Sequence, residues 1–286
     1  MKTALYVLAF ACLLCGAAVM VALVSRRRFR GRVTADVTTL FSNAGVSIGS
    51  DQLRARWDAL PEPVRRYLRY AIREDASDVR TARLRHDGLF RTTPEQRWFP
   101  IEGEQYFTVA RPGFVWNASI RPAPFLWIEA CDRLVSGRGN MLVKLLSTIP
   151  IANAVGEQID QGSSLRWLAE CAWFPYAFVG DQVQWESIDA HSARVRLRCD
   201  GLPVSALVEV DDEGKLTQLR ADRYRDVGGG KAVLTPWTGR YSDYREFNGF
   251  RVPSSVEVTW ELEKEPFSYV RFRVTALEYN VAHRFS

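Results

Sequence analysis

Hydrophobic residues follow two patterns along the chain: one unbroken apolar run near the N-terminus, and a long series of short alternating segments. The run from Ala4 to Val24 holds 21 consecutive uncharged, mostly apolar residues. As a helix that rises ~1.5 Å per residue, this run is long enough to cross a hydrocarbon core of ~30 Å. The segment from Arg26 to Arg32 then carries five arginines. The pattern predicts a membrane-spanning anchor with a basic flank in residues 1–32.

The alternative interpretation of the run is a cleaved signal peptide, whose apolar core is ~7–15 residues long and is followed by small residues at the cut. A small-x-small pattern does precede a cysteine, at Ala9 to Cys12, but it comes too early to follow a full apolar core. Cys15 follows two leucines, where a lipidation site would carry a small residue. We therefore expect an uncleaved anchor.

Residues 33–50 are mixed in polarity and contain a break at Ser42 to Gly45, which predicts a tether. A single α+β domain is expected over residues 51–286. It opens with a helix that Asp51 can cap and that runs through Ala59. In residues 60–72, which follow, Pro63 suits the first turn of a helix and apolar residues recur at helical spacing between arginines.

From Val79 onward, apolar and polar residues alternate between closely spaced turn residues, which is typical of antiparallel strands. The Asp211-Asp212-Glu213-Gly214 sequence is a strong hairpin signal. The expected strands, about eleven in number, are 83–90, 105–110, 114–120, 125–135, 183–188, 195–199, 204–210, 216–224, 237–247, 250–262 and 269–279. So many strands predict a large, strongly curved antiparallel sheet, similar to a half-barrel.

Residues 136–178 interrupt the strand pattern. Residues 141–155 are almost wholly apolar with one lysine, and Ser163 or Ser164 can cap a second helix over residues 165–173. We expect two helical segments that lie across the concave face of the sheet. They either fill the core, or the segment Met141 to Ile151 forms a mobile apolar lid or a membrane-dipping element.

The basic flank accounts for the charge of the chain. The whole sequence has a net charge of +5, and Lys2 and the five arginines supply 6 of its 38 basic residues. The remainder has 32 basic and 33 acidic groups, so it lacks the electrostatic footprint of a nucleic-acid-binding protein. The residues expected to contact anionic lipid headgroups are Arg26, Arg27, Arg28, Arg30 and Arg32. The positive-inside rule places the domain on the cytoplasmic side, with the periplasmic side as the alternative.

The sequence carries no catalytic signature. His86, His191 and His283 do not approach the spacing of metal ligands, no serine lies in a G-x-S-x-G elbow, and the glycines before Lys231 lack the spacing of a phosphate loop. Cys131, Cys171 and Cys199 lie far apart, which is typical of buried small hydrophobes in a reducing compartment. We expect neither a metal nor a cofactor.

Glu170 is the polar residue of most interest, because a carboxylate on a largely apolar helix needs a partner or a shifted pKa. An ion pair of Glu170 with Arg223 would fix the helix against the sheet. The alternative is that Glu170 acts as a general acid or base. Asp243, next to Tyr244, is a further polar residue on an expected strand.

Several segments resemble a family of bacterial membrane-anchored domains of unknown function: LPEPVRRYLRYA, the Trp98-Phe99-Pro100 step, GEQYFTVARPGFVWNA, LRWLAECAWFPYA, RYRD, PWTG and FNGFRVPSSVEVTW. The resemblance covers roughly residues 55–280 in order. It implies a membrane segment ahead of the domain, and it assigns no catalytic role to any residue. The strand count and central helices are similar to the half-barrel of the bacterial lipoprotein-carrier proteins, whose concave apolar face holds acyl chains.

These observations favour a non-catalytic protein that binds an apolar or lipid-like ligand at the membrane surface. Its partners would be membrane lipids and an acyl chain or another apolar small molecule. The candidate ligand-binding residues are Trp116, Trp127, Met141, Leu145, Ile149, Trp167, Glu170, Trp173, Arg223, Trp237 and Trp260. The alternatives are a protein–protein interaction or scaffold module at the membrane, and an enzyme centred on Glu170.

Overall fold

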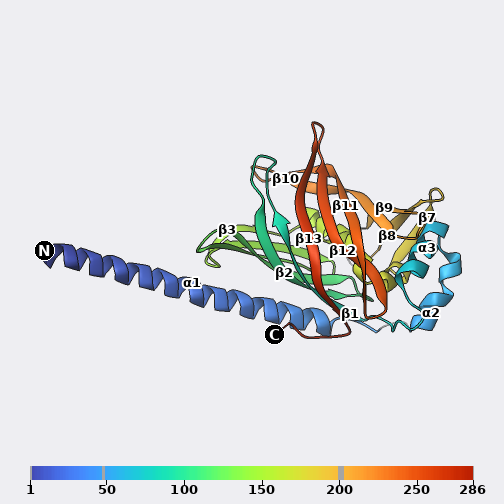
Figure 1. Cartoon of the computed structure of the whole chain (residues 1–286), viewed down its shortest axis with the longest axis horizontal. Helices are drawn as coiled ribbons and strands as arrows, with labels where there is room; N and C mark the ends of the chain where they lie inside the picture. The colour runs from blue at the N-terminus through green and yellow to red at the C-terminus, as the bar shows by residue number, and fades with distance from the viewer. Residues whose placement is uncertain (1, 47–48, 199–202, 286) are drawn as a thin grey trace.

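The computed structural model describes residues 2–46, 49–198 and 203–285, and shows one long helix attached to a curled sheet (Figure 1). Helix α1 runs from Lys2 to Ser42, and its N-terminal half extends away from the rest of the chain (Figure 1). Among the described residues, α1 is the one helix long and apolar enough to cross a membrane, with a mean hydropathy of 2.8 in its most apolar window. A signal sequence near an N-terminus passes the same test.

Within the described residues, thirteen strands form one antiparallel sheet in the order β6-β5-β4-β3-β2-β1-β13-β12-β11-β10-β9-β8-β7. The strands are β1 Thr81–Phe90, β2 Phe99–Thr108, β3 Gly113–Ala123, β4 Leu126–Val135, β5 Arg138–Leu145, β6 Ile149–Ala154, β7 Val183–Ser187, β8 Ser192–Leu197, β9 Val204–Val210, β10 Leu216–Gly228, β11 Lys231–Phe247, β12 Phe250–Glu261 and β13 Pro266–Tyr279. The pairing of β1 with β13 joins two meanders into one curled sheet. The expected large curved antiparallel sheet is confirmed, although the strand count exceeds eleven.

Short helices cover one face and one end of the sheet. They are α2 Ser50–Ala55, η1 Trp57–Ala59, α3 Glu62–Ala71, α4 Glu157–Glu170, η2 Cys171–Trp173 and η3 Pro175–Val179. Helix α3 confirms the helix expected within residues 60–72, and it buries Val64, Tyr67 and Leu68. We call the face of the sheet that α4 covers the inner face. Leu84, Phe107 and Phe114 of this face are fully buried in the main core.

Helix α4 crosses the inner face and links the two flanks of the sheet. Asp160 on α4 accepts a hydrogen bond from the Gly139 N–H of β5 at 2.6 Å, and the Gln161 side chain donates to the Asp222 carbonyl of β10 at 2.8 Å. We expected this helix to begin after Ser163 or Ser164, but it begins at Glu157. Ser163 instead lies inside the helix as a small contact residue: a Cβ added at Gly139 would approach its Oγ to 2.6 Å.

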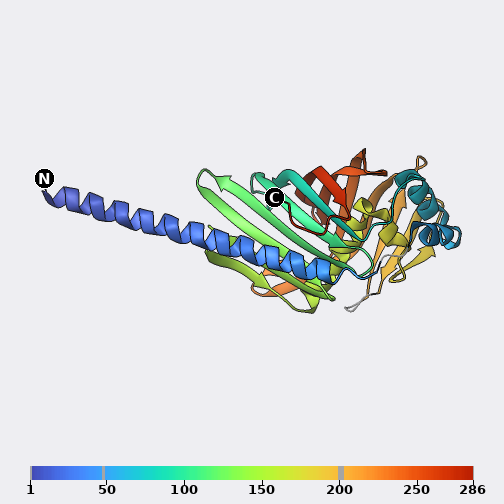
Figure 2. The same cartoon turned by 90° about the horizontal axis from the view of Figure 1, so that it is seen from below.

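The two ends of the sheet differ, because successive turns of an antiparallel meander alternate between them. At the closed end, α3 and the 3-10 helices cover the strands: Ile72 bridges to Phe250, and the Tyr279 hydroxyl donates to the Trp173 carbonyl at 2.7 Å. The open end carries the β1–β2, β3–β4, β5–β6, β10–β11 and β12–β13 turns. The N-terminal half of α1 projects from the side where the tips of β3–β4 and β5–β6 lie (Figure 2).

The C-terminal half of α1 packs on the outer face of β2 to β5, opposite α4. Phe29, Val33, Val37 and Leu40 form a second buried cluster with outer-face side chains of the sheet. A tether was expected from residue 33, but the helix continues through Ser42 and its last turns are buried. The polar residues that indicated a tether lie on the solvent side of this amphipathic stretch.

The expected helix over residues 141–155 is wrong. These residues form strands β5 and β6, which add two strands to the expected series. In β5, Met141 and Val143 lie on the inner face, and Leu142 packs against α1 on the outer face. A strand covered on both faces has a continuous apolar sequence instead of an alternating one.

Candidate functional site

A buried ionic cluster on the inner face is centred on Arg166 of α4. Its guanidinium donates to Glu170 Oε1 at 2.9 Å, to Asp132 Oδ2 at 2.8 Å and to Gln105 Oε1 at 3.2 Å. Gln105 Nε2 donates to the other Glu170 oxygen at 2.6 Å. The Arg166 guanidinium also lies over the ring of Trp116, 4.6 Å from its centroid. The cluster therefore joins α4 to β2, β3 and β4.

Burial dominates the electrostatics of this cluster. It raises the pKa of the Glu170 and Asp132 carboxyl groups above their ordinary values, and the charge of Arg166 offsets this effect only in part. Both oxygens of Glu170 are held by Arg166 and Gln105, so neither faces an open space where a substrate proton could lie. This geometry supports a structural role for Glu170 over acid–base catalysis.

A second buried polar pair extends the cluster toward the centre of the sheet. The Trp116 indole N–H donates to His86 Nε2 at 2.8 Å, and the His86 ring stacks on Phe272 with centroids 4.0 Å apart. Because an indole can only donate, the Nε2 atom of His86 must be unprotonated. Burial, together with the nearby charge of Arg166, lowers the pKa of His86 to about 3.

The expected ion pair between Glu170 and Arg223 is wrong, because Glu170 pairs with Arg166 on its own helix. The Arg223 guanidinium lies instead over the Trp237 ring, 5.3 Å from its centroid. It packs close to α4 at Gly162, where an added Cβ would lie 3.1 Å from Arg223 Nε. Within the described residues, no hydrogen bond or ion pair engages this guanidinium, which is half-buried. Asp243 accepts a hydrogen bond from Ser255 at 2.7 Å and lies outside the cluster.

Most apolar side chains on the inner face are buried, but a set in the half of the sheet toward the open end stays partly exposed. Leu84, Val252 and Leu277 near the closed end are buried. Further toward the open end, some inner-face side chains pack against the core but remain partly exposed, and we call this set the open-end apolar surface. Its members are Phe90, Phe99, Ile128, Val143, Ala221, Val256, Tyr269 and Phe272. Met141, Leu145, Trp237 and Trp260 belong to the same face, as their strand registers show.

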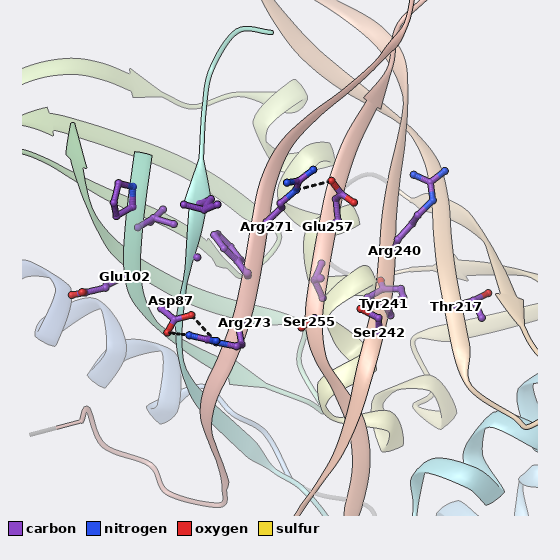
Figure 3. Close-up of a pocket in the computed structure, with 16 residues that line it drawn as sticks. Asp87, Glu102, Thr217, Arg240, Tyr241, Ser242, Ser255, Glu257, Arg271 and Arg273 are labelled. Carbon is purple, nitrogen blue, oxygen red and sulfur yellow. Dashed lines mark hydrogen bonds and ion pairs between the residues drawn. The ribbon is translucent and has the colours of Figure 1, made fainter. Parts of the chain in front are cut away.

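A hollow of about 820 Å³ lies on the opposite, outer face of β1, β2 and β10 to β13 (Figure 3). Its charges are paired with one another: Asp87 with Arg273 at 2.7 Å, and Glu257 with Arg271 at 2.9 Å (Figure 3). Glu102 is likewise paired, with Arg121 at 3.1 Å. A surface of paired charges presents no excess of one sign to a ligand, so the inner face is the stronger candidate.

The candidate residues from the sequence fall into three groups. Trp116, Met141, Leu145, Glu170, Arg223, Trp237 and Trp260 share the inner face, as described above. Trp167 and Trp173 are buried in the core, where their indoles donate to the Thr108 and Pro253 carbonyls. Trp127 and Ile149 lie at the open end: Trp127 is on the outer face, stacked under Arg26, and Ile149 is opposite Leu145 in the β5–β6 register and is exposed.

Sequence reasoning missed Arg166, Asp132, Gln105 and His86. Arg166 precedes Glu170 by four residues, which is the spacing of an ion pair on a helix, and this local signal could have identified it. The strand residues of the cluster have no local signal, because only the sheet register brings them under α4.

The described part of the chain contains no group of three or more His, Cys, Asp or Glu residues that could hold a metal ion. Cys131 and Cys171 are buried free thiols, as expected. Cys199 lies outside the described residues.

The structure is thus a half-barrel with one helix across its inner face and a long apolar helix on its outer face. The chain belongs to a family of unknown function (DUF6544), whose profile matches residues 52–272. This confirms the resemblance to an uncharacterised family. No curated protein matches the chain.

Two solved structures have a similar chain path. One is a LolA superfamily protein from Nitrosomonas europaea, with a TM-score of 0.40 and 10% identity over 82% of this chain and 94% of that chain. The other is a DUF1329 family protein from Desulfovibrio piger, with a TM-score of 0.35 and 13% identity over 80% of this chain and 93% of that one. These likenesses concern the fold and assign no ligand to this chain.

The ionic cluster predicts a large effect of removing its cation. Replacing Arg166 by Met leaves Glu170 and Asp132 as uncompensated buried carboxylates, so the free energy of unfolding should fall by about 3–5 kcal/mol. Chemical denaturation of the purified full-length chain measures this change. Arg56→Met, which removes an exposed ion pair with Asp181, is the matched control and should cost below about 1 kcal/mol. Equal, small losses for both variants would contradict the cluster's structural role.

The depressed pKa of His86 predicts a pH dependence of stability. Below pH ~6.5 the unfolded chain binds a proton at this histidine that the folded chain does not bind until about pH 3. The contribution of His86 to stability should therefore fall by about 1.4 kcal/mol per pH unit between pH 6 and 4. The stability difference between the wild type and His86→Gln, measured across this range, isolates the effect. A pH-independent difference would refute the assignment.

Proposed function

We propose that this protein is a membrane-anchored, non-catalytic binder of an apolar or lipid-like ligand, held on the open-end apolar surface of its inner face. The first half of α1 supports the anchor. Its apolar side chains, such as Leu8 and Leu13, are exposed, and no part of the described chain covers them. Such a surface is stable only against an apolar phase.

The partly exposed apolar side chains of the open-end apolar surface are the observation that carries the ligand proposal. Large apolar and aromatic side chains of β1, β4, β5, β12 and β13 line the inner face but stay partly exposed at the open end. An apolar chain laid along them would remove this surface from water, which contributes about 25 cal/mol per Å² of area buried. The ligand class follows from this lining, since aromatic and aliphatic side chains are what apolar ligands contact in their sites.

Arg223 gives this surface a polar boundary. Its guanidinium keeps its hydrogen-bond donors free among the described residues, and it lies over Trp237 on the same face. A carboxylate or phosphate headgroup is the partner that such a guanidinium binds best. An amphipathic ligand would therefore place its chain on the open-end apolar surface and its anionic end at Arg223.

The five arginines from Arg26 to Arg32 support the cytoplasmic side for the domain. Anionic headgroups are the matching partners of the exposed Arg27, Arg28 and Arg30. The scaffold alternative would use an edge of the sheet. The edge strand β6 contains Pro150, which removes a hydrogen-bond donor and makes pairing with another strand less favourable.

Native mass spectrometry of the full-length chain, released from detergent in the gas phase, tests the ligand proposal. We expect adducts with the masses of cellular lipids, identified after solvent extraction. Val256→Asn, on the open-end apolar surface, should lose most of these adducts, whereas Leu207→Asn, on the outer face of β9, should retain them. Adducts absent from the wild type, or unchanged by Val256→Asn in a chain with wild-type melting, would count against the proposal.

A further inference from the structure

Several hairpin tips at the open end carry apolar side chains that the fold leaves in water. Phe125, between β3 and β4, is 96% exposed. Ile149 and Ile151 of the β5–β6 hairpin are 53% and 55% exposed. The β10–β11 hairpin adds exposed Val227, Val233 and Leu234. Single exposed apolar residues are ordinary, but a set gathered at one end of a domain marks a contact surface.

Phe125, at the β3–β4 tip, also has an unusual backbone conformation. Phe125 has a φ of 61°, in the left-handed region that glycine and asparagine adopt most readily. A bulky residue in this region is disfavoured, and Phe125 has no packing contact with either core cluster. Neither local conformation nor packing explains this residue, so the contact that uses it must lie outside the domain.

Two ion pairs fix the position of this tip relative to α1. Arg26 pairs with Glu129 at 3.1 Å, and Asp36 pairs with Arg133 at 2.6 Å. Between these contacts the helix advances ~15 Å and strand β4 advances ~13 Å, so the two run side by side in the same direction. Arg26 also lies over Trp127, 5.3 Å from its ring centroid, which strengthens the contact near the start of β4.

The start of β4 therefore lies level with the apolar run. Leu126, the first residue of the strand, precedes Glu129 by three residues and lies ~10 Å beyond the Arg26 contact. Measured along α1 from Arg26 toward the N-terminus, the same ~10 Å reaches past Val24 into the apolar run. Phe125 at the tip extends further still. A bilayer that surrounds the apolar run would meet this tip at its surface.

The charge around the tips fits the same partner. Arg27 and Arg28 on α1 are exposed beside the domain, and Lys231 is exposed on the β10–β11 hairpin. Basic side chains flanking apolar tips are the composition of surfaces that lie in the interface of anionic membranes.

We propose that the open-end hairpin tips, led by Phe125, insert into the headgroup region of the bilayer and form a second membrane contact beside the anchor helix. This inference rests on the proposed anchoring of α1. The bilayer is favoured over a protein partner because the helix that positions the tip continues directly into the apolar run. The contact would turn the open end, and the open-end apolar surface, toward the source of a lipid ligand.

Spin labelling of the full-length chain in nanodiscs of phosphatidylcholine and phosphatidylglycerol tests this contact. The label is placed at exposed Ala123, next to the tip, after Cys12, Cys15 and Cys199 are replaced by Ser. Cys131 and Cys171 stay, because burial raises the pKa of both thiols and keeps them unreactive. The matched control carries the label at exposed Ala190, in the β7–β8 turn at the closed end.

The collision rates of each spin label with two reagents show whether the label lies in lipid or in water. Oxygen concentrates in lipid, and a nickel chelate stays in water. We expect the label at residue 123 to collide mainly with oxygen and the label at 190 mainly with nickel. Phe125→Ser should shift the label at 123 toward the nickel-accessible pattern while the chain stays in the nanodisc.

Strong nickel access at 123 in a chain that resists alkaline extraction would overturn the tip contact and leave the anchor intact. If neither reagent reaches the label at 123 and its spectrum shows spin–spin broadening, the tip contacts a second copy of the chain. This result would overturn the membrane contact of the tip. Loss of the chain from the nanodisc on alkaline extraction would overturn the anchor and the tip contact together.

Discussion

The seam between the second half of α1 and the outer face of β2 to β5 determines how the rest of the molecule is placed. It combines a small apolar cluster around Val33, Val37 and Leu40 with the Arg26–Glu129 and Asp36–Arg133 ion pairs. The C-terminal tail reinforces it, since Arg284 donates to the Arg30 carbonyl at 3.2 Å and to Glu104 at 3.3 Å. Because the helix is continuous, a rigid seam fixes the direction of the whole apolar run relative to the sheet.

Helix α4 divides the inner face of the sheet into a covered part and a partly exposed part. On the inner face, α4 is held to both flanks of the sheet and to its centre through Asp160, Gln161 and Arg166. Together with α3 and the 3-10 helices, which cover the closed end, this leaves part of the apolar lining toward the open end exposed. At the open end, the tips of β3–β4 and β5–β6 lie on the side from which the apolar half of α1 projects (Figure 2). The apolar half of α1, the partly exposed lining and these hairpin tips therefore lie on one side of the domain.

Patterns formed by residues close together in the sequence predicted much of this fold. The apolar run, the helix around Tyr67 and most strands follow from local periodicity, and each was placed from the sequence. Residues 141–155 were misread because Leu142 is covered by α1 and Met141 faces the inner side, so the alternation of a strand disappears. The tether was misread because the amphipathic stretch after residue 33 finds its partner on strands about a hundred residues away.

The ionic cluster and the ligand-lining residues were predictable only in part, because contacts between residues far apart in the sequence leave no local pattern. Glu170 was recognised as a carboxylate in need of a partner, but the nearest cation in the fold is Arg166, one helical turn away, and not Arg223. Asp132 and Gln105 join the cluster through the register of β2 to β4, which no local pattern reveals. Trp167 and Trp173 share the composition of a ligand site but are buried structural residues. Aromatic content alone does not separate lining from core.

Photo-cross-linking with a phospholipid that carries a diazirine at the end of one acyl chain tests the central claim most directly. The full-length chain in nanodiscs would be irradiated, digested and mapped by mass spectrometry. The account predicts adducts on inner-face residues of β12 and β13, such as Val256 and Phe272, in addition to those on the first half of α1. Adducts confined to α1, with none on the inner face of the sheet, would contradict it.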